Sequence, residues 1–377
     1  MQFEFATAGR ILFGLGVSSQ APKVVAGFGT RALVVTGGSS GRIGIVPENA
    51  EHFIVEREPT IAMAEAGAQL ARERGCDVVV GIGGGSVLDA AKAIAALAAN
   101  PSPALNYLEV IGQGRPLLHP ALPVVAIPTT AGTGSEVTRN AVLAAPECGL
   151  KVSLRSPSML PKVALVDPAL AVSLPPATTA ATGLDALTQL IEPYVSARAT
   201  PLTDALCRDG IPRIVAALPC VFENPADIDG RTQMALGALL SGMALANSGL
   251  GAVHGFAAVL GGRFPAPHGA LCAALLPAVL RGNVRALRDR DPAAVALERY
   301  RQVAQWIAAD PNATAESAAD AAEILVRQLR IPRLAEWGVR PTDLTEVASK
   351  AQQASSMKAN PVKLTSAELE QILMAAL

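Results

Sequence analysis

The sequence contains few aromatic and few charged residues. Of 377 residues, 3% are aromatic and 17% are charged, and the formal net charge is −1. With so few aromatic side chains, platforms for stacking nucleic-acid bases are not expected. A net charge near zero provides no positive field that attracts nucleic acid or an anionic membrane. The composition therefore predicts no nucleic-acid partner.

Cysteine is also scarce, and no long apolar run is present. The five cysteines follow no CxxC spacing, and such an odd, dispersed set favours reduced thiols in a cytoplasmic protein. The beginning of the chain lacks the basic and apolar regions of a signal peptide. Apolar runs such as residues 93–99 are too short to span a bilayer, so we predict a cytoplasmic protein with no membrane partner.

Half of the residues are apolar, which is enough for large cores and, at this length, predicts two domains. The first half alternates short β-branched runs with alanine-rich helical runs. This alternation predicts a parallel sheet covered by helices on both faces. Strands are predicted at residues 32–36, 52–55, 77–82, 123–128 and 163–167, and helices at 59–74 and 87–97.

The pattern changes after Pro176, where the strand runs stop. Stretches rich in alanine and leucine follow, and glycine, proline and asparagine separate them. We predict an α/β domain over residues 1–175 and an all-α domain over residues 176–377. The predicted helices cover residues 178–194, 201–218, 230–247, 250–260, 270–281, 297–308, 315–329, 341–353 and 365–376.

A glycine-rich loop stands where a predicted strand meets a predicted helix. It reads Gly83, Gly84, Gly85 and Ser86. Glycines let the backbone approach an anion closely, and the first N–H groups of a helix are unpaired at the positive end of its dipole. Ser86 is a candidate helix cap and phosphate donor. The loop predicts a phosphate site, but its spacing is not GxGxxG, so a simple glycine turn is the alternative.

A second polar loop follows the next predicted strand. It holds the hydroxyl residues Thr129, Thr130, Thr133 and Ser135 within a few positions. Hydroxyl groups bind ribose, phosphate or carboxamide, and open α/β sheets bind ligands at the carboxyl ends of their strands. We therefore interpret this loop as a ligand-binding segment, with a polar turn as the alternative.

In combination and in order, these motifs resemble the iron-containing (group III) alcohol dehydrogenase family. The likeness spans essentially the whole chain and is carried by Gly83–Ser86 with Asp89, Ala91 and Lys92, by residues 128–136, Lys151, Asp167-Pro168, residues 182–187, 253–255 and 267–269, and Asn360-Pro361. It implies a dehydroquinate-synthase-like architecture, with a dinucleotide-binding domain, a helical metal and substrate domain, and the site in the cleft between them. It also implies that a nicotinamide cofactor, NAD(P), transfers hydride between an alcohol and an aldehyde or ketone.

The resemblance further implies a divalent metal site, which this chain matches incompletely. Family members typically use one Asp and three His. Asp185, His254 and His268 match three of these positions, and Gln189 stands where the remaining His is usual. Asp185 and Gln189 are four residues apart and share a helix face. An Asp and His set suits Fe(II) or Zn(II), but an amide oxygen is a weaker ligand, so the sequence leaves metal binding open.

The catalytic residues implied by the family are His254 and His268. Many members carry another His four residues after His254 that relays the substrate proton, and this chain has Ala258 there. The relay then falls to water, to a ribose hydroxyl or to His254 itself. Cofactor contacts are implied at the glycine loop, at the hydroxyl loop, at Asp89 and at Lys151. Family members are often homodimers, and residues 3–6 are a candidate strand for pairing with a partner.

The choice between NAD and NADP depends on the end of the first long strand. NAD-preferring members often have an Asp there, which accepts hydrogen bonds from the ribose hydroxyls. This chain has Gly37, Gly38 and Ser39 and no acid, so we predict that NADP(H) is tolerated. A simple glycine-rich turn is the alternative.

Three other functions compete with a metal-assisted dehydrogenase. A metal-independent, maleylacetate-reductase-like enzyme reducing an oxo acid is favoured by Gln189 and Ala258. A dehydroquinate-synthase-type lyase would need a cluster of basic residues, and only Arg263 lies near the two histidines in sequence. A non-catalytic binding protein with the same fold is the third. Asp185 and its neighbouring residues favour the dehydrogenase with a small alcohol or carbonyl substrate.

Overall fold

The structure is a computed structural model that describes residues 2–38, 45–46 and 49–377. The described chain divides into two compact units. The described residues of 6–130 and 134–172 form an α/β unit. Residues 2–5, 131–133 and 173–377 form a helical unit. A short piece of the hydroxyl loop, Ala131–Thr133, thus belongs to the helical unit.

The α/β unit is built on a six-stranded sheet in which all neighbouring strands run parallel. Its strand order is β1-β8-β5-β4-β2-β3. The predicted parallel sheet is therefore confirmed. The strands are β1 (Ile11–Phe13), β2 (Ala32–Gly37), β3 (Glu51–Val55), β4 (Val78–Gly83), β5 (Val124–Pro128) and β8 (Val163–Val166).

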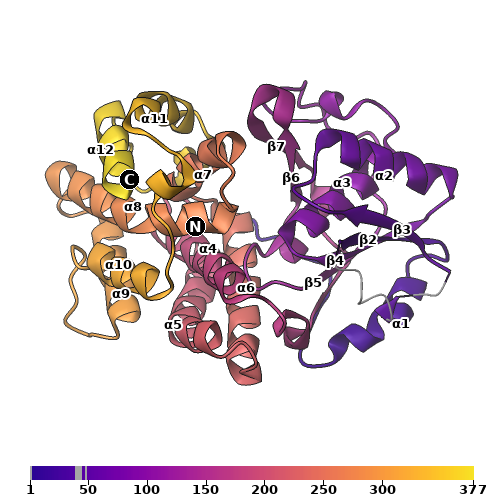
Figure 1. The fold of residues 1–377 in the computed structure, drawn as a ribbon, viewed down its shortest axis with the longest axis horizontal. Helices are drawn as coiled ribbons and strands as arrows, with labels where there is room; N and C mark the ends of the chain where they lie inside the picture. The colour runs from indigo at the N-terminus through magenta and orange to yellow at the C-terminus, as the bar shows by residue number, and fades with distance from the viewer. Residues whose placement is uncertain (1, 39–44, 47–48) are drawn as a thin grey trace. The chain divides into compact units, whose positions relative to one another are not determined.

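Both faces of this sheet are covered, because successive residues of a strand point to opposite sides. Leu33 and Val35 of β2 pack with the helices α2 (Ile61–Glu73) and α3 (Gly85–Ala99). Val34, between them, packs on the other face with α1 (Ala21–Ala26). Figure 1 shows α1 on the opposite side of the sheet from α2 and α3. This double coverage explains why the strands read as continuous apolar runs.

Some elements of the α/β unit escaped the sequence analysis. Strand β1 has only three residues, which is too short for a pattern. An antiparallel hairpin, β6 (Asn140–Ala145) with β7 (Leu150–Arg155), was also missed. In β6, alternate residues are buried, but several of the side chains are alanine, which is not typical of strands. Residues 2–8 form no helix or strand within the described chain.

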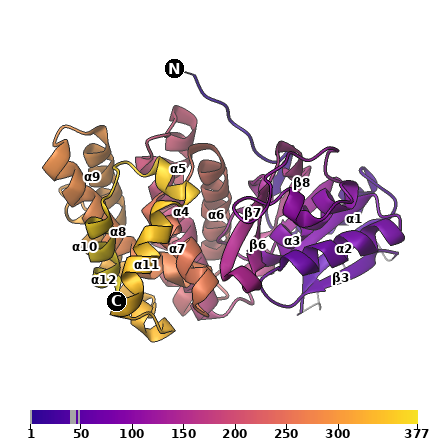
Figure 2. The ribbon, with the colours of Figure 1, turned by 90° about the horizontal axis from the view of Figure 1, so that it is seen from above.

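The helical unit consists of long helices around one apolar core. Figure 2 shows the same unit from a second direction, again as helices only. No strand occurs among its described residues. The helices are α4 (Pro176–Val195), α5 (Pro201–Glu223), α6 (Ile228–Ser248), α7 (Ala252–Arg263), α8 (His268–Arg290), α9 (Val295–Ala308), α10 (Ala318–Gln328), α11 (Leu344–Gln352) and α12 (Ser366–Ala376).

Two of these helices extend well beyond the predicted ends. The chain passes through Pro212 and Pro219 in α5 and through Pro277 in α8 without leaving the helix. The predicted helices 201–218 and 270–281 already contain Pro212 and Pro277, and only Pro219 stands at a predicted end, where an interior proline would remove a backbone hydrogen bond. Here the burial of the apolar face outweighs this local cost, because tertiary packing provides most of the stability of a helix.

Helix α8 is long and apolar enough to cross a membrane by length and composition alone. However, 78% of its most apolar window is buried within the protein. Such burial is expected of the central helix of a folded core. In Figure 1, α8 runs through the middle of the helical unit.

Candidate functional site

The loops predicted to bind the dinucleotide lie at one edge of the sheet. Strand β2 ends at Gly37 and is followed by Gly38, β4 ends at Gly83 and is followed by residues 84–86, and Thr129 and Thr130 follow β5. Strands β2, β4 and β5 are adjacent and parallel, so their carboxyl ends share that edge. After β2 the chain forms β3 on one side of β2 and then β4 on the other side, so the direction in which strands are added reverses at β2. Open α/β sheets bind ligands at such a switch of direction.

The glycine loop is shaped by packing as well as by ligand access. A Cβ on Gly83 would lie 2.6 Å from Cβ of Val87, which is too close for two carbon atoms. Glycine at residue 83 is therefore needed for the first turn of α3 to pack against the end of β4. Gly84 is the N-cap of α3 and makes no side-chain cap hydrogen bond. The prediction that Ser86 caps this helix is therefore wrong, because Ser86 lies inside its first turn. The first turn of α3 remains the candidate phosphate contact.

A buried network joins α3 to the hydroxyl loop and to β6. Lys92 is fully buried and donates to the Ser135 carbonyl at 3.0 Å, to Thr138 Oγ1 at 2.9 Å and to the Asn140 carbonyl. Its Nζ lies 3.1 Å from Oδ1 of Asp89. Burial lowers the pKa of Lys92, and Asp89 acts in the opposite direction. All three Nζ protons thus have acceptors, as a buried cation requires.

Asp89 and Ser135, both predicted cofactor contacts, belong to this network. Asp89 accepts from Ser135 Oγ at 2.5 Å and from the Val142 backbone N–H at 2.9 Å. Their contacts within the protein fix the hydroxyl loop against α3. A direct contact of either residue with the cofactor stays a prediction.

Glu136 is the second buried charge near this network. It is 3% exposed, and burial raises its pKa to about 7, although its own backbone hydrogen bond and Lys92 act in the opposite direction. A carboxyl group titrating near neutrality couples the folding of the α/β unit to pH.

The other predicted cofactor residues have varied surroundings. Lys151 Nζ lies 3.1 Å from Oε2 of Glu58. A Cβ on Gly38 would meet no described residue within 4 Å. Thr133 belongs to the helical unit. Ser39 lies outside the described residues.

The helical unit gathers four potential metal ligands from three helices. They are Asp185 on α4, His254 on α7, and His268 and Cys272 on α8. One ligand atom from each lies within 4.8 Å of all the others. Nε2 of His254 is 3.3 Å from Asp185 Oδ1, and Nε2 of His268 is 4.0 Å from the same atom. The fold therefore brings together three of the four residues predicted as ligands.

A glycine permits this approach. Gly269 follows His268 in the first turn of α8, and a Cβ there would lie 2.3 Å from the Ala181 carbonyl oxygen and 3.2 Å from Asp185 Cβ. Any side chain at residue 269 would push α8 away from α4. The glycine beside His268 is therefore required to bring the α8 ligands to Asp185.

Two buried atoms of the cluster have no hydrogen-bond partner among the described residues. They are Asp185 Oδ1 and His254 Nε2, and the two residues are 2% and 5% exposed. Buried polar atoms are normally satisfied, so this pair points to a missing electropositive partner. A divalent ion between the carboxylate oxygen and the imidazole nitrogen would satisfy both. The donor set thus fits a metal.

The charges around the cluster also favour a cation. Burial raises the pKa of Asp185, but His254 and His268 outweigh this effect and hold it below its usual range. Burial lowers the pKa of His254, but Cys272, Glu192 and Asp185 raise it well above its ordinary value. The pKa of His268 is raised, chiefly by Cys272. The surrounding carboxylates and thiol therefore stabilise positive charge at this point.

Glu192 orients His254 from outside the cluster. Its Oε2 is 2.6 Å from Nδ1 of His254, and its Oε1 accepts from the Val253 backbone N–H at 2.7 Å. With the Nδ1 proton donated to Glu192, Nε2 is the ring nitrogen that faces Asp185, and it is available to a metal that displaces its proton. This carboxylate–imidazole pair is usual behind a metal-ligating histidine. The sequence analysis missed Glu192, although it lies seven residues after Asp185 and so on the same face of α4.

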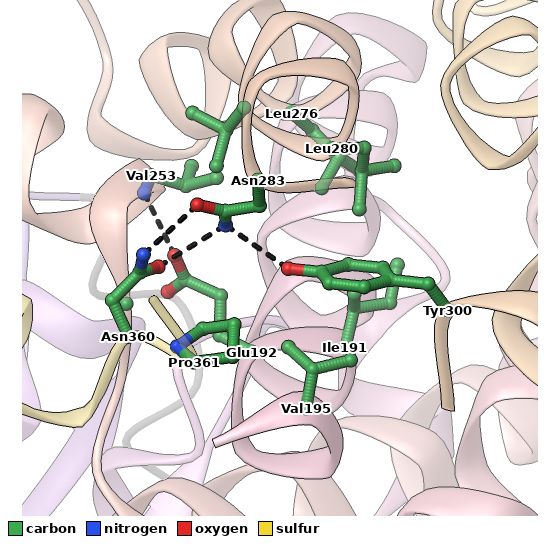
Figure 3. Close-up of a pocket in the computed structure, with 12 residues that line it drawn as sticks. Ile191, Glu192, Val195, Val253, Leu276, Leu280, Asn283, Tyr300, Asn360 and Pro361 are labelled. Atoms are coloured by element: carbon green, nitrogen blue, oxygen red, sulfur yellow. Dashed lines mark hydrogen bonds between the residues drawn. The ribbon is translucent and has the colours of Figure 1, made fainter. Parts of the chain in front are cut away.

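Side chains from distant elements cap the helix that carries His254. Helix α7 begins after Gly251, and Asn360 accepts from the Ala252 N–H at 3.1 Å while Glu192 holds that of Val253. A Cβ on Gly251 would lie 2.9 Å from an oxygen of each capping residue. Figure 3 shows Glu192, Asn360, Asn283 and Tyr300 converging on a small cavity, of about 10 Å³, with room for about one water molecule.

Gln189 has a partner of its own. It lies one turn after Asp185 on α4 and is 4% exposed. Its Oε1 accepts a hydrogen bond from Ser241 Oγ at 3.0 Å. Metal ligation by Gln189, expected from its place in the sequence, stays a prediction and would compete with this hydrogen bond.

Cys272 is the cluster member that the sequence analysis missed. It is fully buried, and its Sγ lies 3.6 Å from Nε2 of His268. His268 and Cys272 are four residues apart and share one side of α8, but the predicted helix began only at residue 270, so this relation was not apparent from the sequence. Arg263, the basic residue near the two histidines in sequence, pairs with Asp343 at 2.7 Å and Glu346 at 2.8 Å.

Comparison with known proteins agrees with both halves of the chain. The profile of the iron-containing alcohol dehydrogenases matches residues 8–168, and that of the C-terminal region of the Fe-containing alcohol dehydrogenase family matches residues 179–377. Alcohol dehydrogenase 4 of Saccharomyces cerevisiae is 37% identical over 361 residues, covering 92% of this chain and 91% of the yeast protein.

Solved structures share the fold over its whole length. A crystal structure of 1,3-propanediol oxidoreductase superposes with a TM-score of 0.89 at 31% identity and covers 100% of both chains. Sulfoacetaldehyde reductase from Bifidobacterium kashiwanohense, solved with NAD+, has a TM-score of 0.85 at 26% identity, covering 99% of this chain and 98% of its own.

The chain belongs to the iron-containing alcohol dehydrogenase family. It is an enzyme that interconverts an alcohol and an aldehyde or ketone, and its family uses NAD(P) and a divalent metal. The resemblance stated from the motifs, the dehydroquinate-synthase-like architecture and the dehydrogenase activity are confirmed. The relatives do not favour the reductase of oxo acids or the lyase.

Proposed function

We propose that the α/β unit binds NAD(P) at the carboxyl edge of β2, β4 and β5, and that the helical unit holds a divalent metal and the substrate. The contacts proposed for the cofactor are Gly37, Gly38, Ser39, Gly83, Gly84, Gly85, Ser86, Asp89, Thr129, Thr130, Thr133, Ser135 and Lys151. The observation that carries the metal assignment is the unpaired couple of Asp185 Oδ1 and His254 Nε2. This couple supports ligation by Asp185, His254 and His268.

A divalent ion at this point supplies Lewis acidity towards an alcohol or carbonyl oxygen. The protein residues prepare the site for it. Glu192 keeps the Nδ1 proton of His254 and so fixes the direction of the ring. Asp185 provides the single full negative charge among the three proposed ligands, and its burial excludes water from that side.

The substrate enters from the side of His268 in this proposal. The His268 side chain is 33% exposed, whereas those of Asp185 and His254 are 2% and 6% exposed. An alcohol oxygen therefore meets His268 before it meets the other ligands. Because Ala258 has no titratable group, the substrate proton passes to water, to a ribose hydroxyl or to His254.

The nicotinamide cofactor performs the hydride chemistry, and the protein positions it. The NAD+ complex of the Bifidobacterium relative supports NAD as a cofactor, and the absence of an acidic residue at Gly37 and Gly38 supports tolerance of NADP. We further propose a cytoplasmic homodimer acting on a small alcohol or carbonyl substrate, in line with the composition and the family.

The test is the replacement His254→Ala in protein purified without chelator. The loss of this ring should lower kcat/KM for alcohol oxidation by at least about 10²–10³-fold, the usual effect of removing one group that stabilises developing charge. Steady-state kinetics with a panel of short alcohols and aldehydes measures it. Unchanged turnover would refute the assignment.

His119→Ala is the matched control. His119 lies in the α/β unit and is exposed. Its contacts with Asn100 are made by its backbone N–H and carbonyl and not by its ring. This variant should keep wild-type kinetics. A comparable loss in both variants would point to general damage to the protein.

A further inference from the structure

We propose that Cys272 completes the metal site as a thiolate ligand, giving an Asp-His-His-Cys set that selects zinc over iron(II). The proposal rests on the metal site of the proposed function and assigns its fourth protein ligand. In this arrangement Cys272 serves as the fourth protein ligand, because this chain has Gln189 where the family usually has the fourth, histidine ligand.

Distances within the cluster fit four ligands around one ion. A tetrahedral zinc ion with bonds of about 2.0–2.3 Å separates its ligand atoms by about 3.3–3.8 Å. Asp185 Oδ1 lies 3.3 Å from His254 Nε2, and Cys272 Sγ lies 3.6 Å from His268 Nε2. The remaining separations do not exceed 4.8 Å, so small rotations of side chains close the set.

Helix geometry directs the thiol to this point. His268 and Cys272 are one turn apart on α8, so both side chains lie on the same side of the helix. Gly269 lets that side approach α4 at Asp185. The Cys272 sulfur is thereby held among polar ligand atoms.

Cys207 shows what a packed cysteine looks like in the same unit. It is also fully buried, in α5, and burial raises the pKa of its thiol. It is not a member of the group of potential ligands found among the described residues. Burial therefore does not distinguish the two cysteines. Cys272 differs because an aspartate and two histidines lie near its sulfur.

The competing ligand is already engaged. Gln189 Oε1 lies 3.0 Å from Ser241 Oγ and accepts a hydrogen bond from it. The same hydroxyl proton is shared with the Ala238 carbonyl oxygen of α6, 2.8 Å away. Ligation by the amide would break a buried hydrogen bond to α6, whereas the Cys272 contact at 3.6 Å is with His268, which is itself a proposed ligand. A neutral amide oxygen is also a weaker ligand than a thiolate for zinc.

The change of donor has a consequence for metal choice. Thiolates are soft ligands that favour zinc, whereas carboxylate and imidazole sets also accept iron(II). The protein purified without chelator from metal-replete cells should therefore contain zinc in excess of iron. Elemental analysis measures the ratio.

Cobalt(II) provides the direct test, because a cobalt–thiolate bond gives an intense near-ultraviolet charge-transfer absorption that oxygen and nitrogen ligands do not give. Metal-free full-length protein, prepared with a chelator, is titrated with cobalt(II) alone. The wild type should show this absorption together with the visible bands of four-coordinate cobalt. Cys272→Ser should keep visible bands and lose the charge-transfer absorption, and its zinc affinity should fall by at least about 100-fold.

Cys207→Ser is the matched control and should keep the complete spectrum. Gln189→Ala should also keep the charge-transfer absorption, since in this proposal the amide is not a ligand. Visible bands without charge transfer in the wild type would overturn the role of Cys272 and leave the three-ligand metal site intact. Failure of the wild type to bind cobalt would overturn the metal site as well. The wild-type spectrum decides even where Cys272→Ser does not fold.

Discussion

The two units each bury a cluster of charged side chains, and the clusters differ in whether their polar atoms are satisfied. In the α/β unit, every Nζ proton of Lys92 has an acceptor and both carboxylate oxygens of Asp89 are engaged. In the helical unit, Asp185 Oδ1 and His254 Nε2 have no hydrogen-bond partner among the described residues.

This difference separates a cluster that stabilises the fold from one prepared for a ligand. A satisfied buried network rigidifies its surroundings, and here it holds the hydroxyl loop on α3. An unsatisfied one is destabilising unless something else binds. Buried charges therefore stabilise the fold in one unit and await a ligand in the other. Mutations in the helical cluster should mainly lower activity, and mutations in the α/β cluster should mainly lower the free energy of unfolding.

Asp185→Asn should produce the largest loss of activity with little loss of stability. The amide keeps the shape but removes the charge that faces His254 and His268, so kcat/KM should fall by about 10²–10³-fold or more. The free energy of unfolding of the metal-free protein, measured by urea denaturation, should fall only modestly, because the lost attraction of His254 and His268, which holds the pKa of Asp185 low, is partly offset by the removal of a buried charge. A large destabilisation of the metal-free protein would show that this cluster, too, is structural.

Lys92→Met should show the reverse. Removing the cation takes the counter-charge from Asp89 and one donor each from the Ser135 and Asn140 carbonyls, which should destabilise the α/β unit by about 3–5 kcal/mol. Urea denaturation followed by circular dichroism measures this. Activity per folded molecule, assayed at saturating cofactor, should decline far less than in Asp185→Asn. A stable Lys92→Met protein would contradict the structural role of the network.

Glu136 makes the stability of the α/β unit depend on pH. Its pKa is raised from 4.5 to about 7, so between these values the folded protein holds a proton that the unfolded chain has lost. Stability should therefore decrease as the pH rises from about 4.5 to about 7, by on the order of 3 kcal/mol, and stay low above that window. Glu136→Gln should flatten this dependence in urea denaturations from pH about 5 to about 8. An unchanged slope would assign the dependence to another group.

Gly38→Asp should give the smallest effect and tests the cofactor edge alone. Among the described residues, none lies within 4 Å of a Cβ at residue 38. Repulsion of a 2′-phosphate should lower kcat/KM with NADPH relative to NADH by about tenfold, or about 1.4 kcal/mol, while NADH kinetics stay near wild type. Equal effects on both cofactors would place the ribose elsewhere. The control is Ser19→Asp, which adds the same charge on an exposed helical turn of the α/β unit.

The sequence predicted regular elements well where the pattern was long. Strands β2, β4 and β5 and helices α2 and α3 lie within a few residues of their predicted positions, because both faces of the sheet are buried and the apolar runs are continuous. Strand β1 and the hairpin β6–β7 were missed, since the first is very short and the second alternates small side chains. Helices α5 and α8 pass through prolines because packing outweighs a local preference.

The candidate site divides in the same way. Asp185, His254 and His268 were recognised from motifs in the order of the chain, and the glycine loop from its place between a strand and a helix. Glu192 and Cys272 were not recognised. Each lies on the same helix as a predicted ligand, but a single glutamate or cysteine in an apolar helix has no local feature that marks it.

The sequence by itself determined the two classes of secondary structure and the family, and it named the proposed ligands, since all of these depend on local pattern. Only the tertiary structure decided which buried charges are satisfied. That depends on atoms from α4, α7 and α8 meeting within 4.8 Å, and on Gly269 allowing the approach. Contacts between residues nearly a hundred positions apart are set by packing, which no single segment encodes.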